Sequence, residues 1–338
     1  MKIKNYIIKK LGVGNAFKVK YKILRKKPSS IRIDICASCN AKCPMCPRVY
    51  MPEDRMTGFM ELEKFKKYAS EARDLGIKKL KIYLTSEPTL HPHFEEIIRY
   101  SKSSGFKIYI STNGSLLHKY VETFKLIDHI QFSIEGWDKE SYEKFRFPLK
   151  FDRVFQNMKL YFEHSKGINQ HKVIHLLLSR KTKIKEFMDL WGDYVDEVKV
   201  DFVQPANIYS RGVMTSGMSD LLEEDYYKFD VIKKNFSCFD PFEEITIGYD
   251  GKVLLCCLDF SGSYDLGHAD NGLKSIQSNP LLKSVKKQFY NQKMNICKDC
   301  SLFYRPSEES LNNVQKMIDD YQSDSNIKDK ITFNPRTF

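Results

Sequence analysis

The sequence lacks the features of membrane-spanning, secreted and disulfide-linked proteins. No stretch of about 18 consecutive apolar residues occurs, so we expect no transmembrane helix. Residues 1–20 contain no uninterrupted apolar core of a secretory signal, because lysines occur throughout them. The nine cysteines are an odd number, which argues against a disulfide framework. We therefore expect an uncleaved cytoplasmic protein, and its 338 residues suffice for two domains or for one large α/β domain with an appendage.

Acidic residues are absent from residues 1–30, which contain nine Lys and one Arg. This segment accounts for most of the formal net charge of +12. Such a basic arm fits a solvated, partly helical extension. It equally fits a segment that binds phosphate-rich surfaces, either nucleic acid or membrane headgroups. Peripheral contact with an anionic surface through residues 1–30 is therefore one hypothesis.

Predicted strands and helices alternate through the central part of the chain. The strand segments are rich in Ile, Val, Tyr and Phe, and they comprise residues 31–36, 79–85, 106–112, 129–135, 172–179 and 197–203. Segments with apolar residues at helical spacing lie between them, at residues 61–75, 93–104, 115–127, 151–165 and 183–195. This alternation predicts a parallel sheet with right-handed crossovers. Six repeats fit an open, partial (β/α)6 barrel, although a doubly wound open sheet has the same periodicity.

A cysteine run directly follows the first predicted strand. Cys39, Cys43 and Cys46 have the spacing Cys-x3-Cys-x2-Cys. Structural zinc sites usually close with four ligands, whereas three thiolates on one loop fit three irons of a 4Fe–4S cluster and leave the fourth iron open. Taken alone, the triplet also fits a zinc knuckle with a distant fourth ligand.

This triplet resembles the signature of the radical S-adenosylmethionine (SAM) superfamily. The resemblance implies a partial (β/α)6 barrel of the TIM type and a 4Fe–4S cluster whose open iron binds SAM. It also implies that one electron from the cluster cleaves SAM to a 5′-deoxyadenosyl radical, which abstracts a hydrogen atom. A flavodoxin- or ferredoxin-type protein would donate that electron.

Motifs that resemble the family's SAM-binding segments follow the next three predicted strands. Residues 85–88 (TSEP) resemble Gly-Gly-Glu-Pro with both glycines replaced, and Glu87 would accept hydrogen bonds from the SAM ammonium group. Residues 111–114 (STNG) and 133–136 (SIEG) resemble Thr-Asn-Gly and Ser-Ile-Asp-Gly. Each motif alone is also a common strand-exit turn. The SAM-binding residues that the resemblance implies are Met45, Ser86, Glu87, Asn113 and Ser133.

A second ordered set of cysteines lies near the C-terminal end. It comprises Cys238, Cys256, Cys297 and Cys300, with a predicted hairpin that turns at Asp250 and Gly251. The set resembles the SPASM/twitch extension of the same superfamily, in its truncated twitch form, which implies one auxiliary 4Fe–4S cluster. The same four thiolates also suit a structural zinc site.

Two cysteines remain outside these sets. Cys36 is most simply a small buried hydrophobe. Cys257 is a bystander, a substitute ligand or a hydrogen-atom donor. The domain hypothesis that follows is a basic arm (1–30), a radical SAM core (31–215), a twitch domain of β-hairpin plus helix (216–302), and a C-terminal helix and tail (303–338).

The cysteine spacing resembles the 2-deoxy-scyllo-inosamine dehydrogenase type of twitch enzyme. The resemblance implies oxidation of a secondary alcohol on a sugar or cyclitol-like substrate, phosphorylated or nucleotide-linked in one version. The auxiliary cluster would accept the second electron. Residues near predicted strand exits are candidates for substrate contact or catalysis, and equally for surface salt bridges: Arg146, Arg180, Gln204, Asn207 and Arg211. Cys257 is a further catalytic candidate.

Two other functions fit the same residues. One is peptide maturation, such as thioether formation or epimerisation, and for epimerisation Cys257 would donate a hydrogen atom. The other is a non-catalytic, zinc-stabilised module whose basic arm binds nucleic acid.

Overall fold

The computed structural model describes residues 28–46, 48, 51–202, 229–231, 240–259, 261–290, 304–323 and 330–333. Its main sheet has nine strands in the order β11-β6-β5-β4-β3-β2-β1-β8-β9. Six of them follow each other in the sequence and pair in parallel: β1 (Ser30–Ile33), β2 (Lys79–Ile82), β3 (Lys107–Thr112), β4 (His129–Ser133), β5 (His171–Leu178) and β6 (Glu197–Phe202). This arrangement confirms the predicted parallel α/β core.

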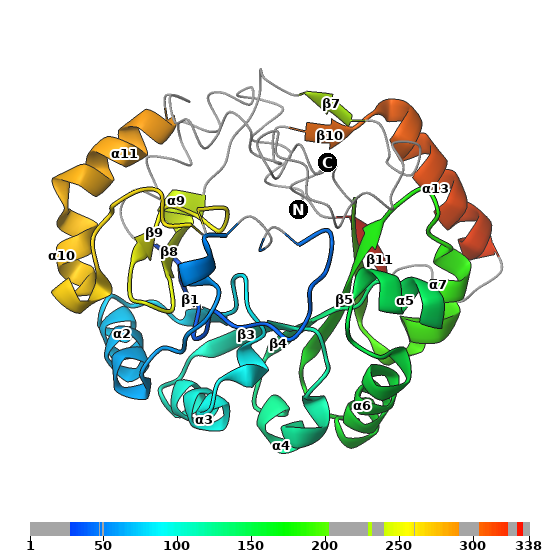
Figure 1. Ribbon diagram of the computed structural model, residues 1–338, viewed down its shortest axis with the longest axis horizontal. Coiled ribbons are helices and arrows are strands. Elements are labelled where there is room, and N and C mark those ends of the chain that lie inside the picture. The colour runs from blue at the N-terminus through cyan, green and yellow to red at the C-terminus, as the bar shows by residue number, and fades with distance from the viewer. Residues whose placement is uncertain are drawn as a thin grey trace.

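Helices follow the strands and lie along the outer side of the curved sheet (Figure 1). They comprise α2 (Leu62–Asp74), α3 (Phe94–Ser103), α4 (Val121–Phe124), α5 (Lys139–Phe145), α6 (Phe151–His164) and α7 (Ile184–Trp191). The sheet and its outer helices form an open arc, as expected for a partial barrel (Figure 1). The predicted fold class is therefore confirmed.

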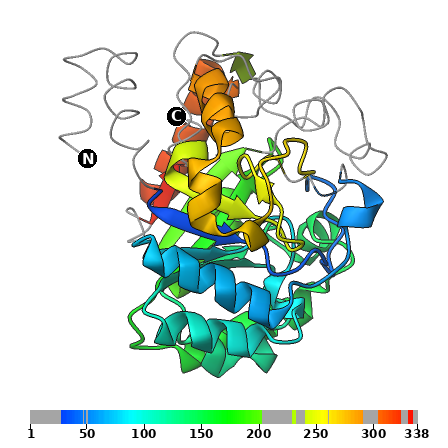
Figure 2. The same cartoon turned by 90° about the vertical axis from the view of Figure 1, so that its left-hand side faces the viewer.

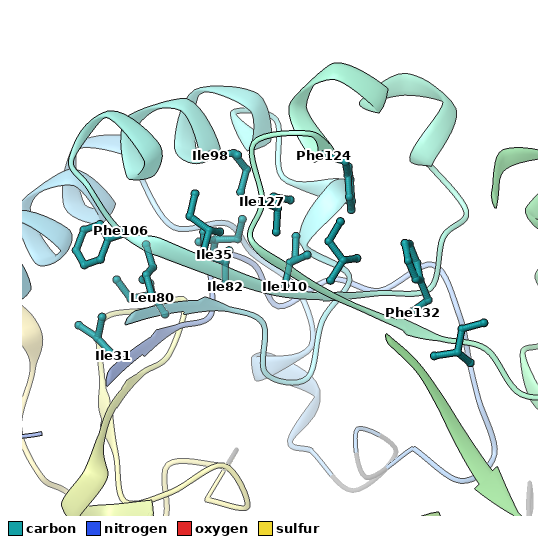
Figure 3. Packing of buried hydrophobic residues seen from close by; sticks show 14 of the residues in the cluster. Ile31, Ile35, Leu80, Ile82, Ile98, Phe106, Ile110, Phe124, Ile127 and Phe132 are labelled. Carbon is teal, nitrogen blue, oxygen red and sulfur yellow. The ribbon is translucent and has the colours of Figure 1, made fainter. Parts of the chain in front are cut away.

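Alternation along each strand separates two kinds of side chain. The helix-facing positions are apolar and fully buried, as Ile31, Leu80, Ile110 and Phe132 illustrate (Figure 3). The inner face carries polar side chains, and four of them lie in register across neighbouring strands: Arg32, Lys81, Tyr109 and His129. The barrel is therefore held together from its outer side, and its inner face is left for polar chemistry.

The sheet also recruits strands from distant parts of the chain. β8 (Glu244–Ile247) pairs in parallel with β1 and forms a hairpin with β9 (Val253–Leu254), which confirms the predicted hairpin. At the opposite edge, β11 (Ile331–Phe333) pairs in parallel with β6. The sequence predicted neither of these two additions to the barrel sheet.

A buried ion-pair group joins β8 to the barrel. Glu244 accepts a hydrogen bond from Arg32 Nε at 2.7 Å and also pairs with Lys81. Burial alone would raise the pKa of Glu244, but the two cations outweigh burial and lower it to about 2. The pairing satisfies charges from β1, β2 and β8 together, so it fixes the hairpin onto the barrel.

The remaining elements cover the two ends of the arc. α10 (Leu273–Ser278) packs beside α2, where the Leu273 amide donates to Glu71 at 2.7 Å, and α11 (Pro280–Tyr290) follows it (Figures 1 and 2). α13 (Glu308–Ser323) packs against α7 through an apolar face, which confirms the predicted C-terminal helix. The other described α-helices and strands are α9 (Asp240–Glu243), β7 (Phe229–Val231) and β10 (Tyr304–Pro306), and short 3-10 helices lie at Glu53–Arg55, Pro88–Leu90, Leu117–Lys119, Gly192–Tyr194 and Ala269–Asn271. No described helix has the length and apolar character needed to span a membrane.

Candidate active site

The three cysteines of the run lie together on the loop that follows β1. Cys43 is buried in a small apolar cluster, and Cys39 and Cys46 pack against that cluster. The Cys46 amide donates to the Cys43 carbonyl at 3.0 Å, which forms a tight turn between two of the thiols. Met45 is buried in the same cluster, and its contact with SAM stays a prediction.

The surroundings of the thiols favour their neutral form. Burial, followed by the charge of Glu87, raises the pKa of Cys39 to about 12. Burial, followed by the proximity of Cys43, raises the pKa of Cys46 to about 11. A thiol in such a setting ligates only when a cationic centre stabilises its thiolate form.

The donor set of the loop suits a 4Fe–4S cluster. Among the described residues, no group of three His, Cys, Asp or Glu side chains forms a site for one metal ion. In a 4Fe–4S cluster each thiolate binds its own iron, so the thiols need to surround the cluster and not a single point. Cys39, Cys43 and Cys46 are the residues that would hold it, with one iron left for SAM.

Glu87 lies beside Cys39 at the end of β2, but its carboxylate is engaged by the chain itself. Oε1 accepts from the Thr89 amide, the Thr89 hydroxyl and the Thr112 hydroxyl, at 3.2, 2.6 and 2.8 Å. Oε2 accepts from the Asn113 amide at 2.7 Å, and its second lone pair stays available for one more donor. The predicted contact with the SAM ammonium group stays a prediction, limited to that position.

Asn113 joins the end of β3 to the cysteine loop. Its Nδ2 donates to Asn40 Oδ1 at 2.8 Å, and its Oδ1 accepts from the Ser115 amide at 3.0 Å. Asn40 in turn donates to the Ser115 hydroxyl at 2.9 Å. The side chain of Asn113, for which contact with SAM stays a prediction, therefore positions the loop that carries the thiols.

Two further predicted SAM contacts are hydroxyls on the inner face. Ser86 donates to Asp34 Oδ1 at 2.6 Å, and Ser133 lies 3.1 Å from the Ser111 hydroxyl. Sequence reasoning missed Asp34. Burial raises its pKa to about 6, despite the hydrogen bond from Ser86. The sequence feature that could have identified Asp34 is its place between Ile33 and Ile35 in the first predicted strand, where charged and apolar residues alternate.

The inner face of β5 and β6 carries an imidazole–carboxylate pair that sequence reasoning also missed. His175 Nε2 lies 3.8 Å from Asp201 Oδ2. His175 is in register with Ser133 on β4, and Asp201 with Leu177 on β5. His175 and Leu177 are two residues apart on β5, so they lie on the same face of the strand, roughly 7 Å from each other. Leu177 packs against the cysteine cluster, and His175 is therefore the next residue on that face. The sequence features that could have identified His175 and Asp201 are a histidine among apolar residues in the predicted strand 172–179 and the alternation of charged and apolar residues in the predicted strand 197–203.

The structure places the other candidates differently. Arg146 turns its guanidinium toward Cys43, with Nη1 at 3.3 Å from Sγ, so it serves the cysteine loop and not a solvent-exposed contact. Arg180 is exposed in the turn after β5. Cys257 donates to Asp240 Oδ2 at 3.4 Å and adjoins Cys256, while Cys36 is buried as expected. Seven predicted positions or segments lie outside the described residues: 1–27, Gln204, Asn207, Arg211, Cys238, Cys297 and Cys300.

Comparison with known proteins decides the family. The model of the radical SAM superfamily matches residues 33–190, which contain the cysteine loop and the strands that surround it. The chain belongs to the radical SAM superfamily. The model of SPASM, an iron–sulfur cluster-binding domain, matches residues 238–301 and so includes the whole second cysteine set. A radical SAM enzyme with these domains binds SAM at one 4Fe–4S cluster and holds an auxiliary iron–sulfur cluster, so the zinc module is not supported.

Relatives of known sequence match only parts of the chain. A probable GTP 3′,8-cyclase from Methanococcus maripaludis is 32% identical over 118 residues, which are 34% of this chain and 39% of that protein. A tungsten-containing aldehyde ferredoxin oxidoreductase cofactor-modifying protein from Pyrococcus furiosus is 36% identical over 87 residues, 25% of this chain and 24% of that one. This radical SAM chain thus spans less than half of either relative, and their reactions do not transfer to it.

Solved structures share the fold over most of the chain. Streptococcus suis SuiB bound to S-adenosylmethionine has a TM-score of 0.61 at 16% identity and covers 80% of this chain and 72% of its own. BtrN in complex with AdoMet and 2-DOIA has a TM-score of 0.50 at 18% identity and covers 82% of this chain and 94% of its own. At these identities the likeness establishes the architecture alone.

Proposed function

We propose that this radical SAM enzyme oxidises a secondary alcohol to a ketone. The substrate is a sugar or a cyclitol-like compound, with or without a phosphate group or a linked nucleotide. The observation that carries the proposal is the His175–Asp201 pair on the inner face of the barrel, next to the strand position that packs against the cysteine loop. Alcohol oxidation requires a group that accepts the hydroxyl proton, and an imidazole paired with a carboxylate is suited to that role.

The reaction divides between bound groups and the chain's own residues. When bound, SAM with its cluster supplies the radical that removes hydrogen from the carbinol carbon, and the auxiliary cluster supplies an acceptor for the second electron. His175 takes the hydroxyl proton, and Asp201 stabilises the imidazolium that forms. The Ser111 hydroxyl, which can both donate and accept a hydrogen bond, orients a neighbouring hydroxyl of a polyol, and Ser133 beside it keeps its predicted contact with SAM.

The attachment of β8 to β1 supports the electron-accepting part of the proposal. The hairpin that leads to Cys256 is a continuation of the barrel sheet and is fixed by the buried Glu244 pairs. A second cluster held on such a rigid element keeps a constant position relative to the barrel. BtrN, whose crystal structure holds AdoMet and 2-DOIA, has the same fold over most of this chain and supports a small polar substrate.

Peptide modification is the second candidate, because SuiB bound to precursor peptide SuiA has a TM-score of 0.60 to this chain. In that version Cys257 would donate a hydrogen atom. That role belongs to epimerisation, and a Cys257→Ala variant that retains full turnover would exclude epimerisation through Cys257.

The test is an anaerobic assay with reconstituted protein, dithionite, SAM and a panel of inositols, aminocyclitols, sugar phosphates and nucleotide sugars. We expect one class to stimulate 5′-deoxyadenosine formation and to yield an equal amount of ketone, trapped as a hydrazone. Flavodoxin and ferredoxin, as proposed donors, should replace dithionite. Stimulated 5′-deoxyadenosine without a product oxidised by two electrons, or no stimulation across the panel, contradicts the proposal.

His175 is tested in the same assay by His175→Gln, with His164→Gln at the exposed last residue of α6 as the control. The expected result is a ketone yield at least tenfold lower at neutral pH, with SAM cleavage in the absence of substrate unchanged. The groups that face His175 on neighbouring strands are Ser133, Lys199 and Asp201. Unchanged ketone formation would remove His175 from the mechanism while leaving the alcohol oxidation itself in place.

A further inference from the structure

Arg146 and Glu135 form a buried ion pair next to one of the cluster ligands. Their side chains are 12% and 2% exposed. The Nη2 of Arg146 pairs with Oε2 of Glu135, while Nη1 lies 3.3 Å from the Sγ of Cys43. One guanidinium therefore connects a carboxylate after β4 with a thiol of the cysteine loop.

The backbone around this pair fixes its position. Gly136 has φ +103°, and a Cβ there would lie 2.4 Å from the backbone N and Cα of Tyr142, so only glycine lets α5 fold back against the end of β4. The Arg146 amide donates to the Tyr142 carbonyl at 2.8 Å. The carbonyl of Phe147, the residue after Arg146, accepts a hydrogen bond from the Lys42 amide at 2.6 Å. The arginine is therefore held between α5 and the cysteine loop.

Both members of the pair act on Cys43 through their charge. A guanidinium stays charged in proteins, and that of Arg146 lies 3.3 Å from the Cys43 sulfur. The Glu135 carboxylate pairs with the same guanidinium, so an anion lies directly behind the cation. In a site with little water, charges at such distances interact strongly.

We propose that Arg146 raises and Glu135 lowers the reduction potential of the SAM-binding 4Fe–4S cluster, so that the ion pair sets how readily the cluster is reduced. One-electron reduction makes the cluster more negative, and a cation hydrogen-bonded to a ligand sulfur stabilises that state. A buried anion beside the cation opposes it. Both are positioning residues, and the inference rests on the family and its cluster, not on the proposed alcohol oxidation.

The experiment is a redox titration of the anaerobically reconstituted full chain, followed by electron paramagnetic resonance. SAM addition identifies the signal of the open-iron cluster, and a Cys39→Ala, Cys43→Ala, Cys46→Ala protein supplies the spectrum of the auxiliary cluster alone. Arg146→Gln should make reduction of the SAM-binding cluster at least tenfold less favourable, a potential about 59 mV lower. Glu135→Gln should shift the potential in the opposite direction, and Arg146→Lys should restore part of the loss.

The opposite signs separate tuning from a merely structural role. Arg153→Gln on α6 and Glu140→Gln on α5 make the same charge changes at exposed positions and should leave the potential unchanged. The auxiliary cluster is an internal control in every sample. Shifts of the same sign in both buried variants, or no shift relative to the auxiliary cluster, would overturn the proposal. If Arg146→Gln does not hold its cluster, the direction of the potential shift is still measured in Glu135→Gln, which should raise the potential, and in Arg146→Lys, which should lower it slightly.

Discussion

The Glu87 carboxylate accepts hydrogen bonds from residues of two neighbouring strand ends, and its own amide donates to the Ser38 carbonyl at 3.0 Å. It therefore stabilises the rim of the barrel next to the thiols. Burial raises its pKa, while these hydrogen bonds lower it. Glu87 stabilises the rim through hydrogen bonds to the chain itself, and this role is compatible with its predicted contact to SAM.

Replacement of Glu87 by Gln should destabilise this rim. The amide NH2 cannot accept a hydrogen bond, so at least one buried donor loses its partner at a cost of about 1–3 kcal/mol. We expect a lower urea midpoint and a lower iron content after reconstitution. Glu96→Gln on the exposed face of α3 is the matched control and should change neither quantity. Equal stability of Glu87→Gln and the unmodified protein would contradict this role.

His129 makes stability depend on pH at the inner face. Burial, followed by the charge of His171, lowers the pKa of His129 to about 4. The unfolded chain therefore binds more protons than the fold between about pH 6.5 and pH 4. Stability should fall as the pH is lowered through this window. Urea unfolding at pH 7 and pH 5.5 should show a smaller loss in His129→Gln than in the unmodified protein, and an equal loss would contradict the assignment.

Sequence reasoning found the residues at the site better than it found their contacts. Cys39, Glu87 and Asn113 follow successive predicted strands, and parallel strands bring such positions to one rim. Two partners of Glu87, Thr112 and Asn113, come from the end of β3, however, and no local pattern specifies which donor reaches which oxygen. His175 was missed because a single polar residue in an apolar run does not show by itself which face of the strand it occupies.

At the scale of elements, periodicity predicted the long amphipathic helices and failed for the short ones. Residues 61–75 and 151–165 correspond closely to α2 and α6. The helix expected over 115–127 is wrong: the segment contains a 3-10 turn, Leu117–Lys119, and the single turn of α4, because the backbone leaves helical geometry at Tyr120. α5 was missed, although Asp138 and Ser141 form its capping box.

Gly136 gives a direct test of how α5 is positioned. Gly136→Ala places a methyl group where the Tyr142 backbone lies, so we expect α5 to shift and the protein to lose iron and more than about 2 kcal/mol of stability. Gly76→Ala is the control, since its φ is +80° but no atom lies within 4 Å of the new Cβ. That variant should cost about 1 kcal/mol and retain its iron. Equal losses in the two variants would show that backbone strain, and not the contact with α5, is responsible.

At the scale of the whole molecule, one sheet joins three separated parts of the chain. β1 to β6 form the barrel, β8 and β9 extend one edge, and β11 extends the other. Strand–helix alternation specified the first part. The two edge additions depend on pairing between segments more than 130 residues apart in sequence, and the short strands β8 and β11 carry no sign of their partner. The architecture of the core was therefore predictable, and its extension was not.

The central claim is that Cys39, Cys43 and Cys46 hold a 4Fe–4S cluster whose open iron binds SAM. Iron analysis with electron paramagnetic resonance of the anaerobic, dithionite-reduced protein tests it most directly. We predict about eight irons per chain and a signal that changes on SAM addition, against about four irons and no SAM response when all three cysteines are replaced by Ala. Zinc in place of iron, or an unchanged SAM response in the Ala protein, would contradict the account.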